Sequence, residues 1–310
     1  MLSRTASELF WMARYLERAE SYARVLDVTS EIINDPPPQP AVAGSGATAE
    51  FVDDPRVVSG APCPLYHEQS AQLFALDGNN PCSIYSCVEM AWNNAHAVRG
   101  SLSAEVWESI NATRIELRTL RQQGLGELGS DGFFEWVKER VHLFRGAVIG
   151  TLLRNDALSF IGIGTLIERA FATTQLLLIK DQQLTNDPDP VREYYRLDTL
   201  LNAVSAREAY NSLYRQPVSR ETVMELLILR NDIPRSLRAS IADPRWASWR
   251  RLPTIVLISR CASPISSTLT CASAPVTTSA QADLQTTLNG LLARINALSD
   301  SIRQTYPEAL

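Results

Sequence analysis

Residues 9–28 read LFWMARYLERAESYARVLDV, and they align without a gap with residues 160–179, FIGIGTLIERAFATTQLLLI. In both segments apolar residues recur at alternating steps of three and four, the spacing of one face of an α-helix. Both also contain the tripeptide Glu-Arg-Ala, at 17–19 and at 168–170. This repeat predicts two related long helices that pack about a pseudo-twofold axis.

The rest of the chain also has the character of a helical protein. Leu, Ala, Arg and Glu are frequent, and only 14 of the 310 residues are glycine, a composition that favours helices. We therefore predict an all-α, bundle-like fold. Hydrophobic periodicity and capping residues predict helices at about 2–33, 83–99, 133–153, 156–183, 191–214, 219–230, 234–242 and 282–304. A further helix is predicted to begin at Ser101 or Ser103 and to end at Gly124.

Two segments interrupt this pattern and define the expected domain organisation. Residues 36–64 are rich in Pro, Ala and Gly, so we interpret them as a loop inserted into a helical domain that spans 1–242. Residues 243–281 include a run dense in Ser, Thr, Ala and Pro, for which we expect irregular, poorly ordered structure. Residues 282–310 should form a C-terminal helix that packs on the domain.

Charge and hydropathy exclude several functional classes. The net charge is −5 and no run of Lys or Arg occurs, so we expect no binding to nucleic acid. No stretch approaches the roughly 18 apolar residues that span a bilayer, and Arg4, Glu8 and Arg14 interrupt any signal peptide. The five cysteines are irregularly spaced, as expected for reduced thiols. We therefore expect a cytoplasmic protein that does not contact membranes.

The arginines of the repeated motif, Arg18 and Arg169, lie within apolar or aromatic stripes and are expected to be partly buried. A buried guanidinium group needs a carboxylate partner. Neighbouring residues of a helix point about 100° apart, so Glu17 is poorly placed to pair with Arg18 of its own helix. We therefore predict crossed pairs between the two helices, Arg18 with Glu168 and Arg169 with Glu17. Such a network could serve only to align the two helices. Alternatively Arg14, Glu17 and Arg18 line a pocket for an anionic or amino-acid-like ligand, or the repeat is a coincidence.

No pattern of catalytic or metal-binding residues stands out. Cys63, His67, Cys82 and Cys87 could be drawn as a zinc site, but their spacing is loose, and buried or idle thiols explain them better. The chain has no phosphate-binding glycine loop, nucleophile elbow or HExxH sequence. We predict no catalytic residue, metal or cofactor. Gly146, Gly150, Gly162 and Gly164 are expected to allow close contacts between helices.

The opening sequence MLSRTASELFWMARYLERAESYARVLDV resembles that of the bacterial Alpha-E family, named for a predicted α-helical domain with a Glu-Arg motif. Similarity extends to FALDGNNPCSIYSC (74–87), SAREAYNSLYR (205–215) and LLILRNDIPRSL (226–237). The family has no established functional residues, so the resemblance implies only shared motif positions as structural or ligand-binding candidates. These are Arg14, Glu17, Arg18, Glu20, Glu168, Arg169 and Arg235.

The resemblance also implies a biological context. Members of the family look like partners of ATP-grasp-type ligases and transglutaminase-like proteins, which are encoded in the same gene neighbourhoods. We therefore expect a non-catalytic accessory protein of a peptide or amide ligase; the alternatives are an enzyme of that pathway and a purely structural scaffold. This chain departs from the family where residues 91–96 read AWNNAH instead of a run with two arginines and a glutamate, and where Thr165 replaces an arginine. Ligand binding through charged helix faces would then be weaker or different.

Overall fold

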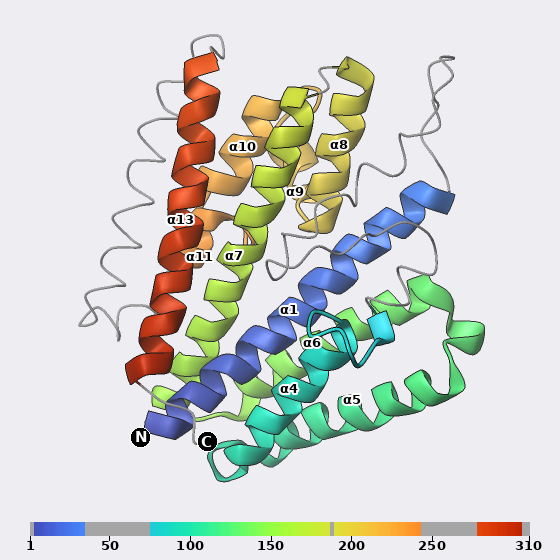
Figure 1. Ribbon diagram of the computed structural model, residues 1–310, viewed down its shortest axis with the longest axis vertical. Coiled ribbons are helices and arrows are strands. Elements are labelled where there is room, and N and C mark those ends of the chain that lie inside the picture. Colours follow the sequence, from blue (N-terminus) through green and yellow to red (C-terminus); the bar gives the residue numbers. More distant parts are fainter. Residues whose placement is uncertain (1–2, 35–74, 187–188, 243–277, 306–310) are drawn as a thin grey trace. The chain divides into compact units, whose positions relative to one another are not determined.

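The computed structural model describes residues 3–34, 75–186, 189–242 and 278–305. Within these ranges every regular element is a helix (Figure 1), which confirms the predicted all-α class. The chain divides into two compact units, Met1–Thr165 and Leu166–Leu310. The boundary falls inside the long helix α7, Asp156–Asn186.

In the first unit, four helices form a ring around a shared core. α1 (Ser3–Asn34) packs along both α4 (Ile84–Ala97) and α6 (Gly129–Thr151), and α5 (Ala104–Gln123) contacts α4 and α6 on the other side. Figure 1 shows α1 in blue and α4 to α6 in cyan and green. The described part of this unit is therefore a four-helix bundle, extended by the first turns of α7.

The core of this bundle contains the apolar seam that the sequence predicts for α1. Leu9, Met12, Leu16, Ala19 and Ala23 are all buried. Ala19 and Ala23 share one apolar cluster with side chains of α4, α5 and α6, among them Ile84, Val88, Leu117, Phe133, Phe134 and Val137. Packing of one amphipathic face supplies most of the stability of such helices.

The ends of α4 and α5 follow the predicted capping residues. Ser83 Oγ accepts a hydrogen bond from the Ser86 amide at 3.0 Å, and Ser103 Oγ accepts one from the Val106 amide at 3.3 Å. Gly124, at φ +79°, ends α5 in a conformation that favours glycine. α6 begins at Gly129, four residues before the predicted start.

In the second unit, the remainder of α7 is accompanied by shorter helices and by one further long helix. These are α8 (Pro190–Ala203), α9 (Arg207–Leu213), α10 (Arg220–Leu229), α11 (Leu237–Ala242) and α13 (Thr278–Thr305). α13 begins four residues before the predicted helix at 282. The predicted loop at 36–64 and most of the segment predicted to be irregular lie outside the described residues.

Two predictions about helix boundaries in this unit are wrong. The helix predicted at 191–214 is divided by Ser205, which adopts φ +52°. The Ala206 amide donates to the Leu201 carbonyl at 2.8 Å and the Ser205 amide to the Asn202 carbonyl at 2.9 Å, the hydrogen-bond pattern of a Schellman motif. The helix predicted at 234–242 begins at Leu237 instead of Pro234. Ser236 Oγ accepts a hydrogen bond from the Ala239 amide at 3.0 Å and so caps this helix.

Gly164 confirms the expectation that a glycine permits a close contact between helices. A methyl group at this position of α7 would lie 2.4 Å from the Phe10 carbonyl oxygen and 3.1 Å from Ala13 Cβ. The start of α7 therefore touches the backbone of α1. At Gly146 and Gly150 the expectation fails within the described residues, since an added Cβ would meet nothing within 4 Å.

We expect Gly164→Ala to reduce the free energy of unfolding by about 1–3 kcal/mol, because its methyl group overlaps the backbone of α1. Gly290→Ala in α13 is the matched control: its Cβ would meet nothing within 4 Å, so it should stabilise the protein by up to about 1 kcal/mol. Urea unfolding of both variants measures the difference. Equal effects of the two substitutions would show that Gly164 does not hold α7 against α1.

Candidate functional site

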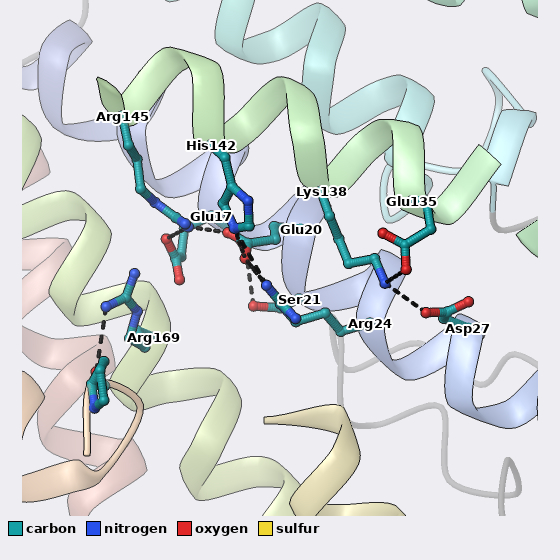
Figure 2. A network of polar contacts seen from close by, with 11 residues as sticks. Glu17, Glu20, Ser21, Arg24, Asp27, Glu135, Lys138, His142, Arg145 and Arg169 are labelled. Carbon is teal, nitrogen blue, oxygen red and sulfur yellow. Dashed lines mark hydrogen bonds and ion pairs between the residues drawn. The ribbon is translucent and has the colours of Figure 1, made fainter. Parts of the chain in front are cut away.

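Two glutamates of α1 are almost completely removed from solvent. The exposed fraction is 1% for Glu17 and 0% for Glu20. They are three residues apart and therefore lie on the same side of the helix. Figure 2 shows both side chains pointing towards α6. Burial of two carboxylates so close together is unfavourable unless cations neutralise them.

Arg145 of α6 supplies the first of these cations. Its Nη2 donates to Oε2 of Glu17 and to Oε2 of Glu20 (Figure 2). Burial by itself would lower the pKa of Arg145, but the charges of the two glutamates and their hydrogen bonds outweigh burial and raise it above its usual value. Arg145 is thus a permanent cation that joins two carboxylates of α1 to α6.

Arg24 and His142 complete the network at its edge. Arg24, one turn after Glu20, donates to Glu20 Oε1 from Nε at 2.9 Å and from Nη2 at 2.7 Å. His142 Nε2 lies 3.5 Å from the same oxygen and 3.4 Å from Arg24 Nη2. The His142 side chain is 55% exposed, so the network extends from the interior to the solvent.

A second set of ion pairs continues along the same two helices. Lys138 Nζ of α6 lies 2.7 Å from Asp27 Oδ2 of α1 and 2.6 Å from Glu135 Oε1. Burial would lower the pKa of Lys138, but hydrogen bonds to Asp27 and Glu135 outweigh it and raise that pKa. Lys138 and Arg145 thus hold α6 against α1 at two levels (Figure 2).

The two arginines that flank Glu17 on α1 lie over aromatic rings. Arg14 is 3% exposed, and its guanidinium carbon is 4.9 Å from the centre of the Trp11 ring. Arg18 is half-buried, with its guanidinium carbon 5.5 Å from the Tyr15 ring. These are cation–π contacts. The contact of half-buried Arg18 with Tyr15 agrees with the predicted place of Arg18 in an aromatic stripe.

The candidate residues of the second repeat lie in the second unit. Glu168 is 2% exposed. Arg169 Nη1 donates to the Pro234 carbonyl at 3.3 Å, and Thr173 Oγ1 donates to the Arg235 carbonyl at 2.9 Å. These bonds attach α7 to the turn before α11. The crossed pairs predicted for Arg18 and Arg169 would join the two units and stay a prediction, as does the pseudo-twofold relation of the repeats.

The sequence predictions missed Arg24, Lys138, His142 and Arg145. A signal for Arg24 was present, because a glutamate and an arginine four residues apart on one helix commonly pair. No comparable signal marked the three residues of α6. Their position opposite α1 depends on how two helices distant in sequence are aligned.

A separate buried cation occurs in the second unit. Lys180 of α7 is 2% exposed, and its Nζ donates to Gln183 Oε1 at 3.1 Å. Burial, with a smaller contribution from the positive charge of Arg196, lowers the pKa of Lys180 well below its usual 10.5. A lysine in this state is a candidate functional group. The adjacent Asp181 accepts hydrogen bonds from Arg220 and from Gln285 Nε2.

Two of the four residues of the zinc site considered above, Cys82 and Cys87, lie in the described part of the chain. Cys82 is half-buried and Cys87 is buried, both as free thiols, whereas Cys63 and His67 lie outside the described residues. In the described ranges, no three His, Cys, Asp or Glu side chains gather as ligands of one metal ion would. In the same ranges, no helix has the length and apolar character required to cross a membrane.

The chain is similar to one protein family and to proteins of two mycobacteria. The model of the Alpha-E family, a predicted alpha-helical domain with a conserved ER motif, matches residues 1–306. The chain is also 27% identical over 262 residues to uncharacterized proteins of Mycobacterium bovis and Mycobacterium tuberculosis. This alignment covers 76% of the chain but only 28% of each relative. No solved structure matches the chain.

We expect Arg145→Met to reduce the free energy of unfolding by about 3–5 kcal/mol, because it removes a cation from two buried carboxylates. Adding Glu17→Gln to this variant should restore part of the loss, since one uncompensated charge is then absent. Glu139→Gln, on the exposed face of the same helix, is the control and should change stability by less than about 0.5 kcal/mol. Urea unfolding measures all three. If Arg145→Met resembles Glu139→Gln, the network is not a stabilising element.

The lowered pKa of Lys180 predicts how the folding stability changes with pH. Between its lowered pKa and 10.5 the unfolded chain binds more protons at this site than the folded chain, so folding stability should rise with pH in that window. The slope from one such group is at most about 1.4 kcal/mol per pH unit. Lys180→Met should abolish this slope.

The measurement is the difference in unfolding free energy between wild type and variant at several pH values. Lys138→Met is the control of opposite sign. The pKa of Lys138 is raised, so its contribution is present below 10.5 and is lost as pH rises above it. A wild-type-minus-Lys180→Met difference that does not vary below pH 10.5 would contradict the lowered pKa of Lys180.

Proposed function

Because the chain belongs to the Alpha-E family, we propose that it is a non-catalytic accessory protein that binds an ATP-grasp-type peptide or amide ligase. The observation that carries this proposal is the length of the mycobacterial relatives, of which the matched region is only 28%. In those proteins the region is one part of a larger polypeptide. Such an arrangement supports a role exerted on a neighbouring domain or protein rather than an independent activity.

The geometry of the candidate site supports the same proposal. Glu17 and Glu20 both contact Arg145, and Glu20 also accepts from Arg24. Carboxylates that are buried and bound to arginine are poor proton donors or acceptors for a reaction. The alternative, an enzyme with Arg14, Glu17 and Arg18 around an amino-acid-like substrate, is less well supported, because Arg14 lies over Trp11 and Arg18 over Tyr15.

The partner class comes from the family resemblance. ATP-grasp-type ligases, and transglutaminase-like proteins as a second candidate, are the proteins expected in the same gene neighbourhood. A protein that binds such a ligase would act through its surface, while its buried ion pairs maintain the bundle. The product of the ligase would be a peptide or another amide-linked molecule.

We expect the tagged chain to recover an ATP-grasp-type ligase from its own cell in near-stoichiometric amount, identified by mass spectrometry after native purification. The purified ligase should then form its amide product faster with the chain than without it. Glu108→Gln, at an exposed position of α5, provides a folded control for the loss of a surface charge. Amide formation by the chain alone would instead support the enzyme alternative, and a preparation that contains no ligase would refute the accessory role.

A further inference from the structure

One side of α4 and the adjoining side of α5 carry aromatic and charged residues instead of core residues. On each helix these residues recur at steps of three and four, so they lie on one face. All of them are half-buried or exposed. We call this set, with one arginine from the turn after α4, the aromatic–arginine stripe. Its members are Tyr85, Glu89, Trp92, His96 and Arg99, and from α5 Trp107, Asn111, Arg114, Arg118 and Arg121.

Cation–π contacts run along the whole length of the stripe. In three pairs, the guanidinium carbon of an arginine lies within the usual distance for this contact from the centre of an aromatic ring. The distances are 4.2 Å for Arg121 and Tyr85, 3.6 Å for Arg114 and Trp92, and 4.9 Å for Arg99 and Trp107.

The two tryptophans are ordered by further contacts within the stripe. Trp92 Nε1 donates to Asn111 Oδ1 at 3.0 Å. The His96 ring stacks on Trp92, with 4.9 Å between the ring centres, and lies 6.0 Å from Trp107. The rings are thus held in place by the bundle itself, and a surface that is ordered in advance loses less entropy when a partner binds.

The stripe holds more positive charge than its own carboxylate can neutralise. Glu89 pairs with Arg114 at 3.0 Å and with Arg118 at 2.5 Å. Among the residues that the structure describes, no carboxylate pairs with Arg99 or Arg121. Four arginines and one glutamate give the stripe a formal charge of +3, in a chain whose net charge is −5.

The other acidic residues of α5 do not cancel this charge. Glu105, Glu108 and Glu116 lie about 100° or more around the helix from Trp107, and Glu116 pairs with Arg140 of α6. Ile115, 55% exposed, borders the stripe on its outer side. Tryptophan, tyrosine and arginine at a surface are the residues that contribute most to binding between proteins. The stripe therefore has the composition of a protein-binding surface with a preference for acidic partners.

The positions of the two arginines without carboxylates define the partner further. Trp107, over which Arg99 lies, and Arg121 are 14 residues apart on α5, which is about 21 Å. A helix of about four turns has this length. Carboxylates at both of its ends would meet Arg99 and Arg121, and apolar residues between them would cover the rings.

Two other kinds of partner fit the stripe less well. An extended segment would leave its backbone hydrogen-bonding groups without partners, because every regular element in the described ranges is a helix and offers no sheet edge. Single-stranded nucleic acid also combines stacking with arginine contacts. Its continuous negative charge, however, is repelled by a chain whose net charge is −5.

From these contacts we propose that the aromatic–arginine stripe binds an acidic amphipathic helix of another protein. This inference goes beyond the ligase proposal, because it names a surface and the chemistry of the segment that occupies it. It does not rest on the identity of the ligase. The test uses the purified chain and a synthetic peptide, so the two proposals can fail separately.

The probe is a labelled helical peptide of about 18 residues, with two glutamates in its first turn, two in its last turn and leucines between them. Fluorescence anisotropy should show binding to the full chain with a Kd of about 1–100 μM. Arg99→Ala combined with Arg121→Ala should raise this Kd at least about fivefold, because both arginines are available to the carboxylates of the peptide.

The matched control is Arg154→Ala combined with Arg238→Ala. It removes the same charge from two exposed positions outside the stripe and should change the Kd by less than about twofold, since distant charges are screened by salt. Circular dichroism checks that both double variants are folded. Absence of binding at about 100 μM peptide, or an equal loss in the two double variants, would overturn the proposal.

Two further probes test the chemistry of the partner. A peptide with lysine in place of each glutamate should not bind, and binding as tight as that of the acidic peptide would contradict the role of the arginines. A labelled oligothymidylate of about 15 nucleotides should bind more weakly than the acidic peptide. Tighter binding that is lost in the Arg99→Ala and Arg121→Ala double variant would identify a nucleic-acid surface and overturn the proposal.

Discussion

The burial of Glu17 and Glu20 against Arg145 is the constraint on which the first unit depends. An apolar seam with a repeat of three and four residues can slide along its partner by one turn and still bury similar surface. Two buried carboxylates cannot, because a shift of one turn would remove the guanidinium group that neutralises them. Hydrophobic packing therefore drives the association of α1 and α6, and the ion pairs specify their alignment.

Three sides of α6 carry three different sets of residues. Phe134, Val137 and Phe144 face the core, Lys138 and Arg145 face α1, and Gly146 and Gly150 face outward. The period of 3.6 residues separates these sets without any irregularity in the backbone. The buried charges contact α1, and the outer surfaces remain for the partner that we propose. This division agrees with a protein whose effect is exerted on others.

Much of the fold could be predicted from the sequence, since it depends on local signals. Ser83, Ser103 and Gly124 mark helix ends through their own chemistry, and the seam of α1 has a plain helical period. Ser205 escaped prediction because the left-handed position of a Schellman motif is usually a glycine. Among the site residues, Glu17 was a candidate because of the repeated Glu-Arg-Ala motif, and Glu20 because of the family resemblance. Arg145 could not be, since only the alignment of distant helices brings it to them.

The separation of Glu17 from Arg145 has a consequence for the synthesis of the protein. The two residues are 128 positions apart in the chain. At a translation rate of about 5–20 residues per second, α1 leaves the ribosome on the order of ten seconds before its counter-ion does. During this interval its apolar seam has no bundle to enter, and its acidic pair lacks Arg145. Nascent α1 is therefore a segment that chaperones would be expected to hold until α6 emerges.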